Sequence, residues 1–369
     1  ALRIRITSMA LTTVRPEGMG FNTGRRNMVI NGAMQVAQRG TSSTTLTTYA
    51  TVDRFLSALS GTTDQLAGTQ AQSTTAPDGF SNSYKIDCTT AETTIDADEF
   101  WRVRHYIEAQ NLQHLKYGTS AAQSVTLSFY VRSNVTGTYA CNIYQPDGVR
   151  QITKTYAISA ADTWEYKTIT FPGDTSGTIN NDNGSGLEIS WFLMAGSTWT
   201  GTDSTSWGAY ANGGLANGHA VNMASSTSNE WYITGVQLEV GTNASDFEHR
   251  SFGEELSLCQ RYFVRWGGTS LFERICHGQC IAGNTAFYHL VFPQTMRAVG
   301  TLGRNGCAGG NASAGATSFS SLTVDTNTDA THSTVLSGIV AGGSFVAGNV
   351  SELFANNSGS HYIQIDAEL

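Results

Sequence analysis

Five residues with side chains of the types that bind sugars fall within one long polar stretch of the sequence. They are Trp199, Asp203, Trp207, Tyr210 and Asn212. A protein surface that binds sugar needs exposed aromatic faces with amides or carboxylates beside them, and long loops often carry function. We therefore expect these residues to form a ligand-binding site. The alternative is that Trp207 and Tyr210 pack over the body of the protein or into a neighbouring subunit, because both residue types are mostly buried and are enriched at interfaces.

Two polar clusters and one cysteine pair have the residue types that bind metals. Oxygen ligands for calcium stand at Asp96–Glu99 and Asn181–Asn183, but neither cluster fits a defined calcium loop, and solvated turns are the alternative. Cys276 and Cys280 have a spacing within the zinc range, yet no second pair at ligand spacing follows them. If Ile275–Ile281 is a strand, both thiols share one face, which favours buried free thiols. We expect no metal and no cofactor, with calcium as the open alternative.

The sequence lacks the local signatures of common enzymes. It contains no nucleophile elbow, zinc-protease helix, P-loop or dinucleotide-binding fingerprint. The 29 acidic residues include no pair that spacing alone marks as glycosidase carboxylates. No repeat of about 20–30 residues indicates a β-helix. We therefore expect a protein without catalytic activity, with polysaccharide cleavage as the alternative.

The charge is uneven along the 369 residues. The net charge is −8, but the first 54 residues hold seven Arg and two acids, or +5, which leaves −13 for the rest. Arg3, Arg5, Arg15 and Arg25 stand in a segment without apolar periodicity, so residues 1–25 are predicted to form an extended arm. Such an arm suits docking onto another protein, and a solvated tail is the alternative. Basic residues are not interleaved with aromatic ones beyond it, so we expect no nucleic-acid partner.

Composition excludes several broad classes of protein. Only 14% of residues are charged, against about 25% in typical soluble domains. Thr, Ser, Asn and Gly take their place, and these are poor helix formers, so a helix-rich fold is excluded. No apolar run is long enough to cross a membrane, and no secretion signal is visible. Six cysteines in a chain of this length do not form a disulfide framework, so we expect assembly in a reducing cytoplasm.

Apolar residues alternate with polar ones in several segments. The pattern is clear in Val125–Val131, Leu187–Leu193 and Tyr232–Val240. Each segment is typical of an antiparallel strand with one buried face and one solvent face, and turn-forming clusters separate them. The spacing predicts an all-β sandwich or jelly roll. We expect the side chains of Val125, Leu127, Phe129, Ile189, Trp191, Val236 and Leu238 to lie inside it.

One short helix is predicted at residues 251–263. Ser251 is a good N-cap, and Glu254 and Glu255 stand in the first turn, where the helix dipole favours acids. The helix separates the sandwich from a second group of strands at 264–369, which we expect to form another β-sandwich. Within that domain, Gly303–Gly315 is predicted to be a loop with few side chains to pack.

Two segments near the ends of the predicted sandwich carry a resemblance. They are RNMVINGAMQVAQRGTS at 26–42, followed by YATVDRF at 49–55, and WYITGVQLEVG at 231–241, which continues through residue 263. Together they resemble the opening and closing of a jelly-roll module in bacteriophage and prophage tail-fibre proteins. The module is similar to carbohydrate-binding jelly rolls. Asn31-Gly32 suits a turn or bulge in a first strand.

The resemblance implies an organisation and a function. Residues 1–25 would be the arm that attaches to other virion proteins, 26–250 the jelly roll, 251–263 the junction helix and 264–369 the distal tip. Fibre subunits of this kind are commonly homotrimers, located in the virion and assembled in the host cytoplasm, and their partner is a host-surface glycan or protein. The alternatives are an adaptor or a head decoration or head-fibre protein that binds only other virion proteins, and a polysaccharide depolymerase.

Overall fold

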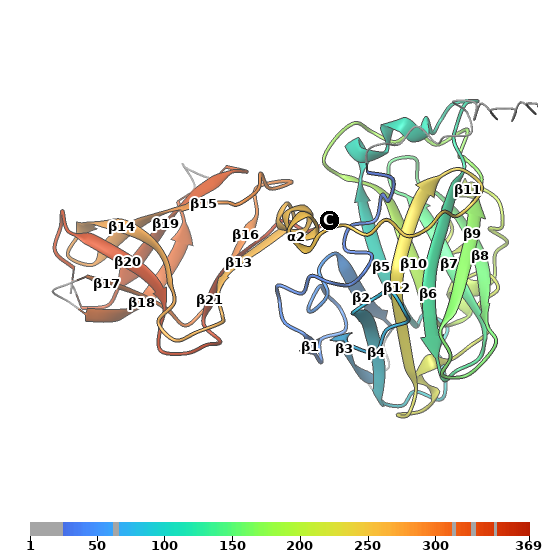
Figure 1. Cartoon of the computed structure of the whole chain (residues 1–369), viewed down its shortest axis with the longest axis horizontal. Coiled ribbons are helices and arrows are strands. Elements are labelled where there is room, and N and C mark those ends of the chain that lie inside the picture. The colour runs from blue at the N-terminus through green and yellow to red at the C-terminus, as the bar shows by residue number, and fades with distance from the viewer. Residues whose placement is uncertain (1–24, 62–65, 312–314, 326–329, 343–344) are drawn as a thin grey trace, which may run out of the picture.

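The chain folds almost entirely into antiparallel β-sheets (Figure 1). The computed structural model describes residues 25–61, 66–311, 315–325, 330–342 and 345–369. The predicted all-β class is confirmed, with few short helices. These are η2 Ala109–Leu115, α1 Ser197–Thr200, η3 Asn212–Gly214, η4 Met223–Ser225 and α2 Phe252–Gln260. The arm lies outside the described residues except for Arg25, which is exposed.

Two six-stranded sheets form the jelly-roll sandwich. The first sheet contains β1 Ser42–Ser43, β3 Ala67–Ser73, β4 Ser83–Thr90, β12 Glu230–Val240, β6 Val125–Ser133 and β9 Glu165–Phe171, in that spatial order. The second sheet contains β11 Gly208–Ala209, β8 Arg150–Ile158, β7 Gly137–Gln145, β10 Ser185–Ala195, β5 Phe100–Glu108 and β2 Phe55–Ser60. Each sheet has an inner face toward the other and an outer face away from it.

The core of the sandwich lies between these two sheets. All seven residues expected inside have no exposed surface, including Trp191 of β10 and Leu127 of β6. The alternation of the sequence therefore predicted the inner face correctly, because successive side chains of a strand point to opposite faces.

The helix α2 links the sandwich to the C-terminal strands. The hydroxyl oxygen of its N-cap, Ser251, accepts a hydrogen bond from Glu254 N at 3.3 Å, as the sequence predicts. Cys259 on α2 and Tyr262 just after it are buried against Ile30 and Val36 of the first segment. The helix is therefore packed on the sandwich and is not a free linker.

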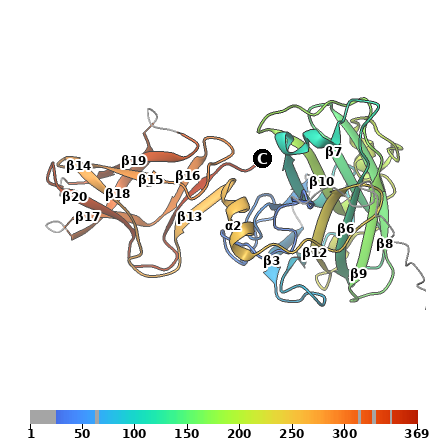
Figure 2. The same cartoon turned by 45° about the horizontal axis from the view of Figure 1, so that its top comes forward.

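The C-terminal strands form a barrel and a small sheet. The closed barrel contains β14 Arg274–Ala282, β15 Thr285–Val291, β19 Ser333–Val340, β18 Gly315–Val324, β17 Cys307–Asn311 and β20 Val350–Ala355. The three-stranded sheet contains β13 Phe263–Gly267, β21 Tyr362–Asp366 and β16 Thr301–Asn305. We expected the C-terminal strands to form a second β-sandwich, but six of them form a closed barrel. Figures 1 and 2 show the barrel farthest from the jelly roll, with α2 and the small sheet between them.

The predicted loop at Gly303–Gly315 is wrong, because the segment contributes to β16, β17 and β18. Its glycines make room inside the narrow barrel. A Cβ on Gly309 would lie 2.6 Å from the hydroxyl of Tyr288 and 2.8 Å from Cζ of Phe319. The glycine-rich composition suggested an unpacked loop, but in the barrel wall a residue without a side chain is needed where Tyr288 and Phe319 pack against the strand.

Candidate functional site

The polar loop after β10 packs on the outer face of the second sheet. Trp199 stands edge-on to Phe100, with ring centroids 4.9 Å apart and planes at 89°. Leu215 and Ala216, from the end of the same loop, pack with Phe100 and Phe192 in a small separate apolar cluster. Trp199 therefore helps to anchor the loop to the sheet.

The other two aromatic candidates rest on other partners. The ring of Trp207 is 5.8 Å from that of Tyr117, and its indole N–H donates to the carbonyl of Pro172 at 2.6 Å. The ring of Tyr210 is 5.0 Å from that of Tyr144 on β7, and 36% of Tyr210 is exposed. The three predicted rings thus lie on three different supports, and Tyr210 presents the most open surface.

The two polar candidates serve turns within the loop. Asp203 Oδ1 accepts hydrogen bonds from the backbone N and the hydroxyl of Thr205, at 3.0 and 2.9 Å. These bonds lower the pKa of this exposed carboxyl. Asn212 is exposed at the start of η3, and its carbonyl accepts from Leu215 N at 3.1 Å. Both side chains remain at the surface, while their backbones hold the loop in place.

Beyond the loop, the strand register brings further polar and aromatic side chains together. On β10, Glu188 lies directly opposite Tyr106 of β5 on one side and opposite Tyr144 of β7 on the other. Arg104 of β5 faces outward two positions before Tyr106. The ring of Tyr210 contacts that of Tyr144 at a tilt of 58°. These residues form what we call the tyrosine face: Tyr106, Tyr144, Tyr210, Arg104 and Glu188.

An ion-pair network fixes the centre of the tyrosine face. Arg104 Nε donates to Glu188 Oε1 at 2.9 Å and its Nη2 to Oε2 at 2.5 Å. Arg102 Nη1 lies 3.1 Å from Oε1, and the hydroxyl of Ser190 donates to the same oxygen at 2.9 Å. Burial opposes ionisation of Glu188, but Arg102 and Arg104 outweigh it and keep the pKa below its usual value. The carboxylate thus orients the two arginines and is itself fully engaged.

The tyrosines around this network keep their protons. Burial raises the pKa of Tyr210. Burial also raises the pKa of Tyr144, and the neighbouring Tyr210 raises it further. Arg104 also lies over the ring of Tyr106, with Cζ 4.8 Å from the centroid. The face therefore offers half-buried ring surfaces, neutral hydroxyls and a held guanidinium, which are groups that bind uncharged polar molecules.

Sequence reasoning found only Tyr210 of this face. Tyr106, Tyr144, Arg104 and Glu188 occupy outward positions of alternating strands, where any polar residue is ordinary. The alternation does mark them as facing away from the core, but it does not say which strands are neighbours. The pairing of β5 and β7 on either side of β10 brings together residues more than 80 positions apart in the sequence.

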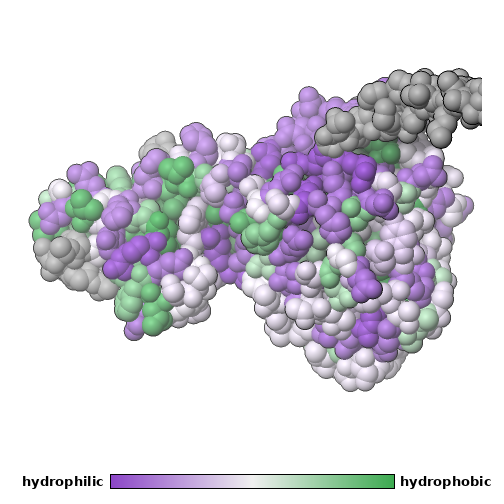
Figure 3. All heavy atoms as spheres, viewed as in Figure 1, coloured by the Kyte–Doolittle hydropathy of each residue, from purple (hydrophilic) through white to green (hydrophobic). Residues whose placement is uncertain are grey.

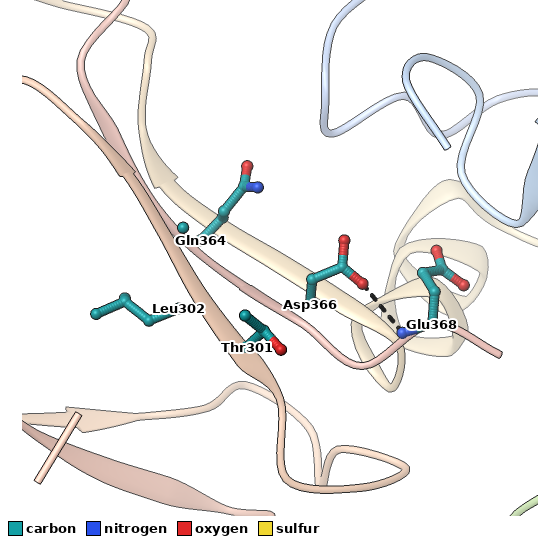
Figure 4. A pocket seen from close by; sticks show the side chains of 6 residues that line it. Thr301, Leu302, Gln364, Asp366 and Glu368 are labelled. Carbon is teal, nitrogen blue, oxygen red and sulfur yellow. Dashed lines mark hydrogen bonds between the residues drawn. The ribbon is translucent and has the colours of Figure 1, made fainter. Parts of the chain in front are cut away.

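A pocket of about 430 Å³ at the domain junction is lined by Thr301, Leu302, Gly303, Gln364, Asp366 and Glu368 (Figure 4). Its acids are already paired. Asp366 lies 2.9 Å from Arg39, and Glu368 pairs with both Arg39 and Arg54. The pocket is therefore part of the contact between the two domains, and we do not assign it a ligand.

The clusters considered for calcium use their carboxylates within turns. Glu99 accepts from the backbone N of Asp96 at 2.7 Å, and Asp182 accepts from that of Gly184 at 2.8 Å. Cys276 and Cys280 are free thiols on β14, half-buried and buried. In the part of the chain that the structure describes, no group of three or more His, Cys, Asp and Glu is placed to hold a metal. Over the same residues, no helix has the length and apolarity to cross a membrane.

No protein-family model matches the chain, and no curated protein matches it in sequence. The solved structures similar to it include the enzymatically active domain of tailspike protein 4 of bacteriophage CBA120, at 12% identity and a TM-score of 0.32. That match covers 58% of this chain and 21% of the tailspike protein, so this chain spans about a fifth of it.

Two carbohydrate-binding modules are also similar to the chain. The family 11 module from Clostridium thermocellum, in complex with a β-1,3-1,4-mixed-linked tetrasaccharide, is 14% identical, with a TM-score of 0.28. The match covers 57% of this chain and 99% of the module. TmCBM61, in complex with β-1,4-galactotriose, is 8% identical, with a TM-score of 0.29, over 59% of this chain and 100% of that one. Likenesses this distant do not say what this chain binds.

Proposed function

We propose that this chain is a non-enzymatic bacteriophage tail-fibre protein that recognises a host-surface glycan with the tyrosine face. The observation that carries the proposal is the convergence of three tyrosine rings around a fixed arginine–glutamate network on an outer sheet face. Rings can stack on the apolar side of a sugar, while hydroxyls and the guanidinium bind its oxygens. The tail-fibre part of the proposal rests on the motif resemblance at 26–55 and 231–263.

Binding to immobilised host-envelope glycans tests the recognition step. The full chain should be retained, and the double substitution Tyr144→Ala with Tyr210→Ala should weaken retention by about tenfold or more, which is about 1.4 kcal/mol. Phe272→Ala is the matched control, because it removes a 44% exposed aromatic ring from the C-terminal domain. Retention that survives the double substitution would assign recognition to another surface.

The same incubation separates the competing functions. Retention with intact glycan supports a non-enzymatic binding protein. Shortened glycan chains would reveal a depolymerase, and the absence of retention would favour an adaptor or head decoration protein that binds only virion components. Each outcome is read from the size of the recovered glycan and from the amount of bound protein.

The proposed location in the virion needs an attachment segment and an assembled fibre. We assign attachment to the basic arm, so deletion of residues 1–25 should leave the strands folded, by circular dichroism, yet abolish incorporation into particles. We also propose a homotrimer, because the barrel exposes apolar side chains that assembly can bury. They are Ile281, Val291, Ile339, Val346 and Val350, and Figure 3 shows hydrophobic residues on this part of the surface. A monomer by light scattering at micromolar concentration would contradict the assembly.

A further inference from the structure

A second pocket, of about 400 Å³, lies on the outer face of the other sheet, away from the tyrosine face. Three parts of the chain line it. Strands β6 and β9 supply Tyr130 and Tyr166, the turn before β4 supplies residues 78–80, and the segment after β12 supplies residues 244–247 and 249. Tyr166 is 46% exposed, so ring surface is open to solvent.

Five rings form one continuous aromatic surface in this pocket. The centroid of Phe80 is 5.0 Å from that of Phe247, 5.6 Å from that of Tyr130 and 5.2 Å from that of His249. Tyr130 continues the surface to Tyr166 at 5.0 Å, and Phe247 contacts His249 at 4.9 Å. We call this set the aromatic pocket.

The backbone beneath the rings is shaped to hold them. Gly235 of β12 has φ +61°, at an irregularity in the pairing with β6 between Thr234 and Gln237. A Cβ at Gly235 would lie 2.7 Å from Cζ of Phe80 and 3.1 Å from Cδ2 of Tyr130. Glycine therefore lets Phe80 lie directly on the strand, and the pocket floor exists before any ligand arrives.

Two carboxylates and one imidazole, that of His249, line the pocket, and among the residues described no Lys or Arg does. Asp78 and Asp246 line it and are exposed, and neither carboxylate pairs with a basic side chain among the residues described. Arg26 approaches Asp246, but its Nη2 donates to the backbone carbonyl at 2.6 Å. The hydroxyl of Ser245 is committed to Glu239 at 2.5 Å. The charged groups of the pocket are therefore the two carboxylates, beside the hydroxyls of Tyr130 and Tyr166 and the imidazole of His249.

Other aromatic rings of this protein are covered by its own cations. Arg39 lies 3.5 Å from the centroid of Phe263, Arg54 lies 3.5 Å from that of Tyr262, and Arg265 lies 4.0 Å from that of Tyr362. No such contact is found at the rings of the aromatic pocket within the described ranges. The electron-rich ring faces and the two carboxylates there both favour a positive charge supplied from outside.

We propose that the aromatic pocket binds an organic cation, specifically an alkylammonium group carried on a larger molecule. A cation over the faces of Tyr or Phe is attracted by the ring quadrupole, more strongly when it is partly desolvated. Methylated nitrogen suits the pocket because its methyl groups bury against rings and it has few or no N–H groups to satisfy. A neutral sugar also suits rings and hydroxyls, but it brings no charge to offset the two unpaired carboxylates. The proposal is independent of glycan binding at the tyrosine face.

Calorimetric titration of the full chain with choline tests the charge requirement, and 3,3-dimethyl-1-butanol serves as its neutral isostere. Choline should bind at millimolar concentration or below, and the isostere at least tenfold more weakly. Tyr166→Ala and Asp246→Asn should each weaken choline binding by about fivefold, whereas Phe272→Ala should leave it unchanged. Asp246→Asn keeps the shape of an exposed side chain, so its effect does not depend on refolding.

Three outcomes would overturn the proposal. Equal affinity for choline and the isostere would make the pocket a neutral apolar site. Choline binding that is insensitive to Tyr166→Ala and Asp246→Asn would place the cation elsewhere. No heat at 10 mM choline, or competition by neutral sugars, would remove the cation assignment. Because the ligand and variants differ from those of the glycan experiment, either proposal can fail while the other stands.

Discussion

Replacing Glu368 by glutamine should strongly destabilise the contact between the two domains. Arg54 has no exposed surface, and its guanidinium stacks on the ring of Tyr262 at 3.5 Å. Its carboxylate partner is Glu368, which also lies 3.2 Å from Arg39. Arg39 has a second partner in Asp366 at 2.9 Å. In the Glu368→Gln variant Arg39 therefore still has a carboxylate partner, whereas Arg54 loses its ion pair.

The expected cost follows from burial. The side chains of Arg54 and Glu368 are 0% and 6% exposed, so solvent screens this pair very little. Burial opposes the charge of Arg54, but in the natural chain Glu368 outweighs it and holds the pKa above its usual value. A guanidinium is not deprotonated in proteins, so Arg54 keeps its charge in the variant without the Glu368 carboxylate to offset it. Removing one partner of a buried ion pair costs about 3–5 kcal/mol, because an uncompensated charge remains inside. We expect a loss of this size in the free energy of unfolding.

Urea denaturation followed by tryptophan fluorescence measures this loss, since urea does not screen charges. The matched control is Glu254→Gln, an exposed acid in the first turn of α2, which should change stability by about 1 kcal/mol or less. If Glu368→Gln stays within about 1 kcal/mol of the natural chain, Arg54 does not depend on this carboxylate and the reasoning is refuted.

Two further changes test the segment that seats α2. Burial raises the pKa of Asp53 from 3.8 to about 6, against the opposing effect of Arg39, so the folded state favours the protonated acid and stability falls as pH rises from 4 through 6. The free energy of unfolding of Asp53→Asn relative to the natural chain should therefore rise by up to about 3 kcal/mol between pH 4 and 7, and a pH-independent difference in urea titrations would contradict this. Gly32→Ala should cost about 3 kcal/mol, because its Cβ would lie 2.1 Å from the carbonyl oxygen of Val236. Gly253→Ala, with nothing within 4 Å, should instead leave the melting temperature unchanged or raise it.

The sequence predicted those parts of the fold that depend on local patterns. Alternation identified the buried face of β6, β10 and β12, and the Ser251 cap with its following acids identified α2. The barrel was missed because closure depends on which strands pair, such as β17 with β20, and no local pattern encodes that partner. Glycine was read as a loop signal at 303–315, whereas the narrow barrel uses it for space.

The two proposed binding surfaces also differ in how far a local sequence pattern reveals them. Tyr210 was found because a long polar loop with aromatic residues is visible in the sequence. The aromatic pocket was not found, because Phe80, Tyr130, Tyr166 and Phe247 come from separate parts of the chain. Gly235 was the available signal, since a glycine inside an otherwise clear strand indicates a bulge or a close approach.

The two segments that carry the resemblance contact each other, and this gives their joint occurrence a physical reason. The side chain of Asn27 donates to the carbonyl of Val236 at 3.0 Å and accepts from Leu238 N at 3.1 Å. Asn31 has φ +61°, and its backbone N donates to Glu255 of α2 at 2.5 Å. The first segment therefore hydrogen-bonds to β12, the last strand of the sandwich, and to the helix α2 that follows it.

Several contacts of these segments hold the two domains together. Arg250, between β12 and α2, donates to the carbonyl of Val29 at 3.1 Å and pairs with Glu248 at 3.1 Å. The amide of Gln38 donates to the carbonyl of Phe263 at 2.9 Å, across the start of the C-terminal domain. Neither segment contributes a residue to the tyrosine face, whereas residues 244–247 and 249 of the second segment line the aromatic pocket. Because the two segments fix α2 on the sandwich, they hold the domain that follows α2 in a set position. The tyrosine face lies outside both segments and is free to differ on the same scaffold.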